Sequence, residues 1–326
     1  MEIPLKGVVI GAGMIGSALD YRKFIAPLTH AGGYKVSPYF TLGGIYDENE
    51  EKKRKAGEYW DCPLYDSVEE LLTKASPDVV SVCIPSNKQP DVLQRLLGYP
   101  IKAVIAEKPL SKNYAISSKI IDAYERAGIP LFVNYTRRYV PLYKELAQKF
   151  QNDEKVLTAS IKYAKGLNHN GSHAIDTARL LFGDIIEAKP LSQRADYWED
   201  DPTISAFIKL HHCEELFLQS LDQRYFTHFE IDIITTKGRY NIHKDSQQLD
   251  IYTINPEAGI PSGARLEFVE TVDTHHDKAM LNLLDEVSSI IYKRKQQIYP
   301  AVQSLATQDV IDSLSKSLRG FVNDKC

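Results

Sequence analysis

Residues 7–16 read Gly-Val-Val-Ile-Gly-Ala-Gly-Met-Ile-Gly, an apolar run that ends in a G-x-G-x-x-G pattern. A buried strand that leads into such a turn and then into a helix is typical of dinucleotide-binding domains. Gly11 allows the tight turn, Gly13 allows the backbone to approach a pyrophosphate, and Gly16 allows the helix to pack on the strand. Glycine-rich turns also occur for purely structural reasons, so the pattern alone leaves nucleotide binding open.

The length and charge of the chain restrict its class. Its 326 residues exceed the usual span of one hydrophobic core, which favours two domains. The formal net charge of -4 gives no basic footprint for nucleic acid. No apolar run approaches the roughly 18 residues of a membrane span, and residues 1–6 do not resemble a secretion signal. We therefore expect a cytoplasmic protein with a small-molecule substrate and no nucleic-acid or membrane partner.

The cysteines give no sign of a metal site or a disulfide framework. They lie far apart and form no C-x-x-C pattern: Cys62, Cys83, Cys213 and Cys326. This spacing favours reduced, structural thiols. Cys213 directly follows His211 and His212, but adjacent residues of a strand point to opposite faces. We therefore predict no metal.

After the glycine turn, the pattern predicts a helix from Met14 to about Ala31 that ends at Gly32-Gly33. A second strand, residues 40–46, leads to Asp47. An acidic residue at this strand end typically holds the ribose 2′-hydroxyl, and it would repel a 2′-phosphate, so NAD is favoured over NADP. Asp47 lies farther past the glycines than the usual ~20 residues, and a longer helix and loop should absorb the difference. Alternatively, Asp47 is a solvated charge that opens the charged run 48–55.

Further strand and helix units complete an α/β domain. We expect a capped helix at 67–72, strands at 78–84, 103–106 and 130–133, and helices at 92–97 and 116–127. Strands this apolar are buried on both faces, as in a doubly wound parallel sheet covered by helices. Such sheets place ligands at the carboxyl ends of their strands.

Beyond residue 155 the pattern changes to strands of alternating character, at 156–162, 203–210, 215–221, 230–235 and 238–242. One covering helix among them, and no regular alternation of helix and strand, predict an α+β domain with a large, mostly antiparallel sheet. One face of this sheet should pack on helices while the other stays open. Amphipathic helices at 277–292 and 304–320 should close the chain.

Several motifs, in order over most of the chain, resemble the Gfo/Idh/MocA family of NAD(P)-dependent oxidoreductases. They are the glycine turn, Asp47, I-P-S-N at 84–87, E-K-P-L at 107–110, V-N-Y-T-R-R-Y at 133–139 and N-G-S-H-A-I-D at 170–176. The resemblance implies a Rossmann domain at 1–134 and a substrate-binding and oligomerisation domain at 135–326. It also implies a homodimer or homotetramer formed through the open sheet face.

Lys108 is the first catalytic candidate. A lysine at a strand end is most often an exposed charge, but Pro109 stiffens the backbone and disfavours a helical conformation for the residue before it. The resemblance implies that Lys108 assists proton transfer on the substrate. The cofactor-binding residues that it implies are Gly11, Gly13, Met14, Ile15, Gly16, Asp47, Pro85, Asn87, Glu107, Lys108 and Asn134.

A helix that begins near residue 166 carries the second candidate. At about 100° per residue, His169, His173 and Asp176 fall on one stripe and can converge. A helix cap with structural histidines is the alternative. The resemblance implies that His173 is the acid/base, because it matches the histidine of the family's D-x-G-x-H-x-x-D motif, in which His169 replaces the first aspartate.

Substrate contacts are implied by the resemblance for Tyr135, Arg138, Asn170 and Asp176, although a structural salt bridge explains Arg138 equally well. The sequence therefore predicts an NAD-dependent oxidoreductase, with Lys108, His173 and His169 as its catalytic residues. Its substrate would be a secondary hydroxyl of a sugar or nucleotide-linked sugar. The replacement at His169 keeps a non-catalytic NAD-binding sensor open, and an NAD-dependent glycosidase is a further alternative.

Overall fold

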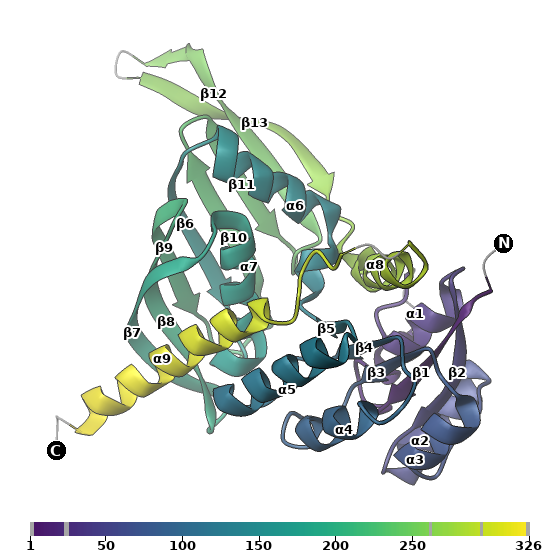
Figure 1. The fold of residues 1–326 in the computed structure, drawn as a ribbon. Helices are drawn as coiled ribbons and strands as arrows, with labels where there is room; N and C mark the ends of the chain where they lie inside the picture. Colours follow the sequence, from purple (N-terminus) through teal and green to yellow (C-terminus); the bar gives the residue numbers. More distant parts are fainter. Residues whose placement is uncertain (1–2, 23–25, 261–262, 294–295, 324–326) are drawn as a thin grey trace. The chain divides into compact units, whose positions relative to one another are not determined.

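The computed structural model describes residues 3–22, 26–260, 263–293 and 296–323 (Figure 1). The chain divides into two compact units, Met1–Tyr139 with Asp277–Leu305, and Val140–His276 with Ala306–Cys326. We expected a single boundary after residue 134. The chain instead returns to the first unit because helix α8, Ala279–Lys293, buries Met280 and Leu284 in that unit's core.

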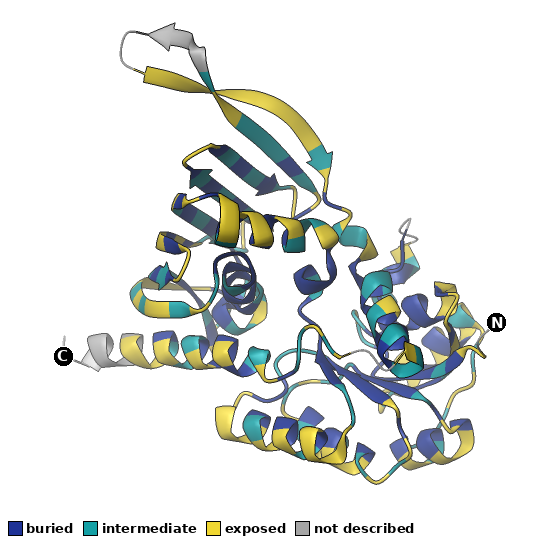
Figure 2. Ribbon diagram, turned by 45° about the horizontal axis from the view of Figure 1, so that its top comes forward, coloured by how far each residue is buried: buried dark blue, intermediate teal, exposed yellow. Residues whose placement is uncertain are grey.

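The first unit is built on a five-stranded parallel sheet with the order β2-β1-β3-β4-β5. The strands are β1 Leu5–Ile10, β2 Phe40–Tyr46, β3 Val79–Val82, β4 Ala103–Ala106 and β5 Leu131–Val133. Figure 2 shows the inner strands of this sheet in dark blue, because helices cover both faces. One core lies under α3 (Val68–Ala75), α4 (Gln89–Leu96) and α5 (Tyr114–Ala127). The other lies under α1 (His30–Val36), α2 (Glu50–Trp60) and α8. The predicted doubly wound sheet is thereby confirmed.

The predicted helix from Met14 to Ala31 is wrong. A single helical turn follows the glycines and leads into a short 3₁₀ helix, Ala18–Arg22, and α1 begins only at His30. Gly32 and Gly33 lie inside α1 instead of ending it. A Cβ on Gly32 would lie 2.3 Å from Asp20 Oδ2, and one on Gly33 would lie 2.9 Å from the Leu284 side chain. These glycines therefore serve close packing.

The second unit contains an eight-stranded sheet with the order β13-β12-β11-β10-β6-β9-β8-β7. Its strands are β6 Val156–Tyr163, β7 Ile185–Trp198, β8 Asp201–Leu210, β9 Cys213–Ser220, β10 Phe229–Thr235, β11 Gly238–His243, β12 Gln248–Ile260 and β13 Gly263–Asp273. All neighbours are antiparallel except β6 and β9. The sequence reading missed β7, β12 and β13, because β7 and β13 are mostly exposed and so lack the alternation that marks a half-buried strand.

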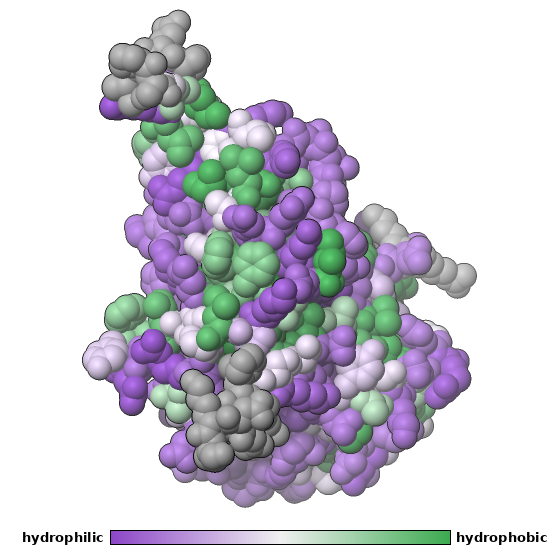
Figure 3. All heavy atoms as spheres, turned by 90° about the vertical axis from the view of Figure 1, so that its left-hand side faces the viewer, coloured by the Kyte–Doolittle hydropathy of each residue, from purple (hydrophilic) through white to green (hydrophobic). Residues whose placement is uncertain are grey.

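One face of this sheet packs on helices, as predicted. Along β10, buried residues alternate with half-buried ones, which is the pattern of a sheet covered on one side. The helices of this unit are α6 Pro141–Gln148, α7 Ser172–Phe182 and α9 Gln303–Asn323. Large apolar side chains remain exposed on the strands: Leu157, Ile186, Leu191, Phe217, Leu266 and Phe268. Figure 3 shows apolar groups in patches between polar ones. Across the described ranges, no helix is long and apolar enough to cross a membrane.

The Asp20 carboxylate holds the segment that leads into α1. The carboxylate is buried, and it accepts hydrogen bonds from Leu28 N at 2.8 Å and Thr29 N at 3.0 Å. Asp20→Ala should lower the free energy of unfolding by about 1–3 kcal/mol, because it leaves buried donors unpaired. Asp122→Ala, on an exposed position of α5, is the control and should change it by less than about 0.5 kcal/mol. Urea denaturation measures both, and equal effects would contradict this role of Asp20.

Candidate active site

The glycine turn brings three backbone segments into contact at the end of β1. Gly11 has a φ of 105°, and a Cβ there would lie 2.4 Å from Cys83 O. A Cβ on Gly16 would lie 1.9 Å from Gly11 O. At Gly13 the opposite holds, because no described atom lies within 4 Å of an ideal Cβ. The turn is thus closed toward the protein and open at Gly13, where the predicted pyrophosphate needs room.

The open side of the turn is where the predicted cofactor residues lie. Met14 is 55% exposed at the tip, and Ile15 is half-buried. Asp47 lies beside the turn, since its Oδ2 accepts a hydrogen bond from Ala12 N at 2.7 Å and its Oδ1 accepts one from Asn49 N at 2.8 Å. Each carboxylate oxygen keeps a further lone pair for a ribose hydroxyl. These groups fit a dinucleotide, and Asp47 is held at the turn instead of extending into solvent.

The carboxyl ends of β3, β4 and β5 form the rest of this edge. Glu107 N donates to Val82 O at 3.0 Å, and Asn134 N donates to Ala106 O at 3.0 Å. Lys108 is half-buried and is joined to Pro109 by a cis peptide bond. Pro85 and Asn87 lie in the exposed turn between β3 and α4. The structure therefore places Lys108 and the predicted cofactor residues on one unit, at the strand ends where such sheets bind ligands.

A buried polar network at this edge was not predicted. His30 is fully buried, with Nδ1 2.9 Å from Ser81 Oγ and Nε2 3.1 Å from Glu107 Oε1. Asn134 Nδ2 donates to the same Glu107 oxygen at 2.8 Å. Burial raises the pKa of Glu107, but its interaction with His30, the hydrogen bond from Asn134 and the charge of Lys108 outweigh burial and lower that pKa overall. Glu107 is therefore ionised at neutral pH.

Asn134 carries an unsatisfied polar atom in this part of the described structure, as does Gln89, whose Oε1 also lacks a hydrogen-bond partner. The Asn134 Oδ1 is buried and has no hydrogen-bond partner. A buried acceptor without a donor is costly, and binding sites are a common place for one. Because Asn134 lies at the carboxyl end of β5, this unpaired acceptor is at the edge of the sheet where such folds bind ligands.

In the second unit, the geometry around His169 differs from the expectation. Residues 166–171 form a wide π-helical turn, so the assumed 100° per residue does not hold before α7 begins at Ser172. The His169 ring contacts Trp198, with ring centroids 5.0 Å apart. Asp201 holds this turn, because its carboxylate accepts hydrogen bonds from Asn168 N at 2.8 Å and His169 N at 3.1 Å. His169 thus belongs to an aromatic cluster at the end of β7.

His173 and Asp176 have different environments on α7. Only His173 and Arg179 are partly exposed on this helix, whose other residues are all buried. Asp176 is among the buried ones, and its Oδ1 accepts a hydrogen bond from Thr307 of α9 at 3.1 Å. Asn170 is half-buried in the preceding turn. His173 is therefore accessible for chemistry, whereas the described contact of Asp176 fixes α7 on α9.

The structure supports a structural role for Tyr135 and Arg138. Both are buried, and the Arg138 guanidinium lies 5.1 Å from the centre of the Tyr299 ring and donates to Gln303. With neighbouring residues they line a hollow of about 10 Å³. That volume has room for about one water molecule and none for a sugar.

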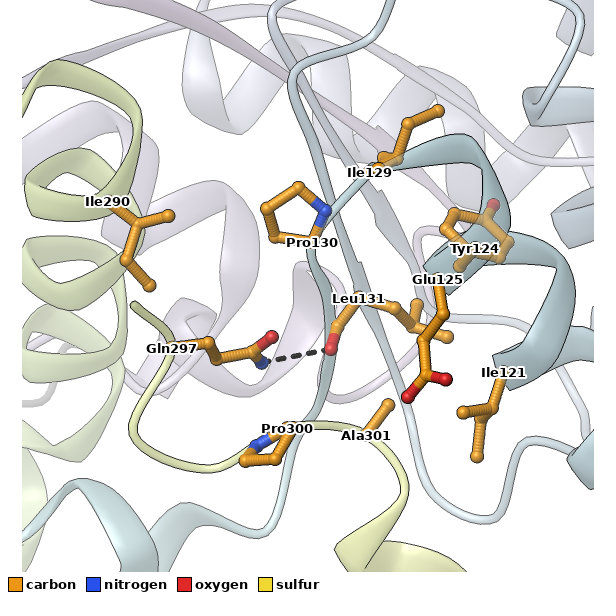
Figure 4. Close-up of a pocket in the computed structure, with 11 residues that line it drawn as sticks. Ile121, Tyr124, Glu125, Ile129, Pro130, Leu131, Ile290, Gln297, Pro300 and Ala301 are labelled. Atoms are coloured by element: carbon orange, nitrogen blue, oxygen red, sulfur yellow. Dashed lines mark hydrogen bonds between the residues drawn. The ribbon is translucent and has the colours of Figure 1, made fainter. Parts of the chain in front are cut away.

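A second hollow in the described part of the first unit contains none of the predicted site residues. It lies beside α5 and α8 (Figure 4), where Gln297 Nε2 donates to Leu131 O at 2.9 Å. Within the described ranges, no cluster of three or more histidine, cysteine or acidic side chains could hold a metal ion. Burial raises the pKa of Cys62 and of Cys213 to about 11, so these thiols stay protonated.

The fold and the open glycine turn define an NAD-binding Rossmann protein, and the comparisons agree. The family model described as "Oxidoreductase family, NAD-binding Rossmann fold" (GFO_IDH_MocA) matches residues 5–135. This match confirms, over residues 5–135, the resemblance seen in the motifs.

Relatives and solved structures extend this finding. Myo-inositol 2-dehydrogenase of Thermotoga maritima is 28% identical over 145 residues, or 44% of this chain and 40% of that protein. The chain thus matches only about two fifths of this curated relative's length. Two solved structures share the fold over nearly the whole chain. UDP-N-acetylglucosamine 3-dehydrogenase of Acidithiobacillus ferrooxidans has a TM-score of 0.73 at 17% identity, covering 96% of this chain and 97% of that one. An Agrobacterium radiobacter oxidoreductase, crystallised with NAD⁺, L-tartaric acid and magnesium, has a TM-score of 0.76 at 14% identity, covering 97% and 96%.

The position of Asp47 predicts the cofactor preference. Its carboxylate should disfavour a 2′-phosphate, so NADH should bind more tightly than NADPH. Asp47→Ala should shift the ratio of the two dissociation constants toward NADPH by about tenfold or more, as removal of roughly 1.4 kcal/mol of repulsion does. Glu48→Ala is the control, because Glu48 is exposed and paired with Lys88 at 2.6 Å. Fluorescence titration measures both ratios, and an unchanged ratio in Asp47→Ala would show that Asp47 does not face the ribose.

Proposed function

We propose that this chain is an NAD-dependent oxidoreductase acting on a secondary hydroxyl, or the corresponding keto carbon, of a sugar or nucleotide-linked sugar. The observation that carries the proposal is the edge of the parallel sheet. There the open glycine turn, anchored by Asp47, lies on the same edge as the turn that carries Lys108. The names of the inositol and UDP-N-acetylglucosamine dehydrogenases support the substrate class.

The proposed chemistry assigns one task to each group. NAD, when bound, supplies the hydride acceptor. Lys108 donates a hydrogen bond to the substrate oxygen and stabilises the negative charge that develops there. His173 receives the hydroxyl proton as general base.

His169, Asn170 and Trp198 are proposed to contact the substrate. The rings of His169, Trp198 and Tyr197 form successive edge contacts, with centroids 5.0 Å and 4.4 Å apart. The Lys165 ammonium lies 5.0 Å from the centre of the Tyr197 ring. An aromatic cluster with a neighbouring cation, one helical turn before His173, suits a ring that carries polar or anionic substituents. In this role His169 orients the substrate and does not tune His173.

The wider setting of the enzyme is also proposed. We expect a cytoplasmic homodimer or homotetramer that buries the apolar side chains exposed on the strands of the second unit, because a face with this many of them is typical of an interface. Sedimentation of the purified chain tests the oligomeric state.

A non-catalytic NAD-binding sensor is the second candidate, because His169 stands where the family motif has an aspartate. One experiment separates it from the oxidoreductase. NADH fluorescence is titrated with a panel of nucleotide-linked sugars and free polyols, and NADH formation from NAD is then followed with each compound that binds. The oxidoreductase predicts net NADH formation with at least one of them. A glycosidase would cleave a substrate without net NADH, and a sensor would bind NADH without turnover.

If Lys108 is catalytic, its replacement should lower turnover. Lys108→Met should lower kcat by about 10² or more, as loss of a positioned proton-transfer and charge-stabilising group does, and should leave NAD affinity within a few-fold. Lys102→Met is the matched control, since Lys102 is exposed and paired with Asp78 at 2.8 Å. Steady-state kinetics compares the two, and kcat near the wild-type value in Lys108→Met would refute the assignment.

A further inference from the structure

The helix after the glycine turn is interrupted and then resumed in register. Ser17 N donates to Gly13 O, as in an ordinary helical turn. His30 N then donates to Ile15 O at 3.1 Å, and Ala31 N donates to Gly16 O at 3.0 Å. In an unbroken α-helix, a carbonyl accepts from the residue four positions later. In an unbroken helix the N–H of Leu19 would donate to Ile15 O. His30 takes that place, although it comes eleven positions later in the sequence.

The return of the chain is fixed by buried hydrogen bonds. The Thr29 hydroxyl donates to Asp20 Oδ2 at 2.6 Å and accepts a hydrogen bond from Gly32 N at 3.1 Å, which caps α1. Thr29 is fully buried. Because Thr29 directly precedes His30, this cap determines where the imidazole enters the protein.

The hydrogen bonds of His30 form one directed chain. Burial raises the pKa of Tyr34, so its hydroxyl stays protonated and can donate to Ser81 Oγ, 2.8 Å away. The Ser81 hydroxyl can then donate to His30 Nδ1, and His30 Nε2 can donate to the Glu107 carboxylate. Every proton in this chain has an acceptor when the imidazole is neutral and protonated on Nε2. A chain in which each donor is paired holds one arrangement, because any other leaves a buried group unpaired.

Glu107 is the group that this chain holds in place. Its carboxylate accepts from His30 and Asn134, and its backbone N–H is bonded to Val82. The turn continues through Lys108 to Pro109, whose carbonyl accepts from Gln89 Nε2 at 3.0 Å. The backbone of this turn sets the position of the Lys108 Cα atom and the direction of its Cα–Cβ bond.

We propose that His30 is a positioning residue, which holds Glu107 and thereby orients the turn that carries Lys108. The catalytic consequence rests on the proposed function, whereas the hold on Glu107 does not. The other titratable groups near Glu107 are Lys108 and the Cys83 thiol, whose pKa is raised by burial and then by the Glu107 charge. Loss of the His30 hydrogen bond should therefore raise the pKa of Glu107.

The test compares three variants of the full-length protein. His30→Phe keeps a ring but removes both nitrogens, and His30→Gln retains an N–H that can reach Glu107. Tyr34→Phe is the control, because it removes the far end of the same buried chain. NMR of ¹³C-labelled glutamate gives the titration midpoint of Glu107, and kinetics gives kcat and KM. Thermal unfolding gives the stability of each variant.

His30→Phe should move the Glu107 midpoint to higher pH and lower kcat by about ten- to a hundredfold, as expected for a misplaced catalytic group. His30→Gln should restore both to within about threefold of wild type. Tyr34→Phe should lower the stability of the protein and leave both the Glu107 midpoint and kcat nearly unchanged. An unmoved midpoint in His30→Phe, or equal losses of kcat in all three variants, would overturn the proposal.

Two measurements test the proposal if a variant does not fold or no substrate is turned over. If His30→Phe does not fold, ¹⁵N NMR of the histidines in the wild-type protein reports the tautomer, which should be protonated on Nε2. An imidazole protonated on Nδ1 would overturn the proposal. If the wild-type chain turns over no substrate, the proposed function fails, and the Glu107 midpoint still decides whether His30 holds that carboxylate.

Discussion

The contact between backbones at the glycine turn is the constraint on which the candidate site depends. A single methyl group on Gly16 would lie 1.9 Å from Gly11 O, and one on Gly11 would lie 2.4 Å from Cys83 O. No rearrangement of side chains can relieve overlap with backbone, so the turn, the end of β3 and the first helical turn must keep one arrangement. That arrangement leaves the space at Gly13 open and presents Ile15 O and Gly16 O to the returning chain.

In both units, hydrogen bonds to a carboxylate fix the backbone beside a candidate catalytic residue. A buried or largely buried carboxylate accepts several hydrogen bonds and fixes the segment beside the candidate catalytic side chain. In the first unit, Glu107 accepts from His30 and Asn134 and is followed by Lys108. In the second, Asp201 accepts from the turn that precedes His173, and Gly166 approaches it so closely that a Cβ would lie 2.2 Å from Asp201 Oδ2. Moving either carboxylate would leave it without these donors, and a buried charge without hydrogen bonds is costly.

The sequence predicted those parts of the fold whose cause lies within a few neighbouring residues. The glycine turn, Asp47, the buried strands and the capped helix at Ser67 all carry a signal within a few residues, and the structure has them. The interrupted helix could not be read in this way. Residues 14–31 have apolar side chains at helical spacing, and only the tertiary bonds of Asp20 reveal that the chain leaves and returns. His30 was missed for the same reason, because its partners Ser81 and Glu107 are far away in sequence. The π-helical turn before α7 likewise follows from Asp201, thirty or more residues later.

In the proposed function, the sheet edge of the first unit supports transfer of a hydride from a sugar carbon to NAD. The most direct measurement is mass spectrometry of NADH formed from sugars and nucleotide-linked sugars deuterated at the oxidised carbon. Deuterium should appear in the NADH, and NADH should accumulate as the substrate is consumed. NAD binding with no transfer of deuterium from any of these substrates would contradict the proposed function.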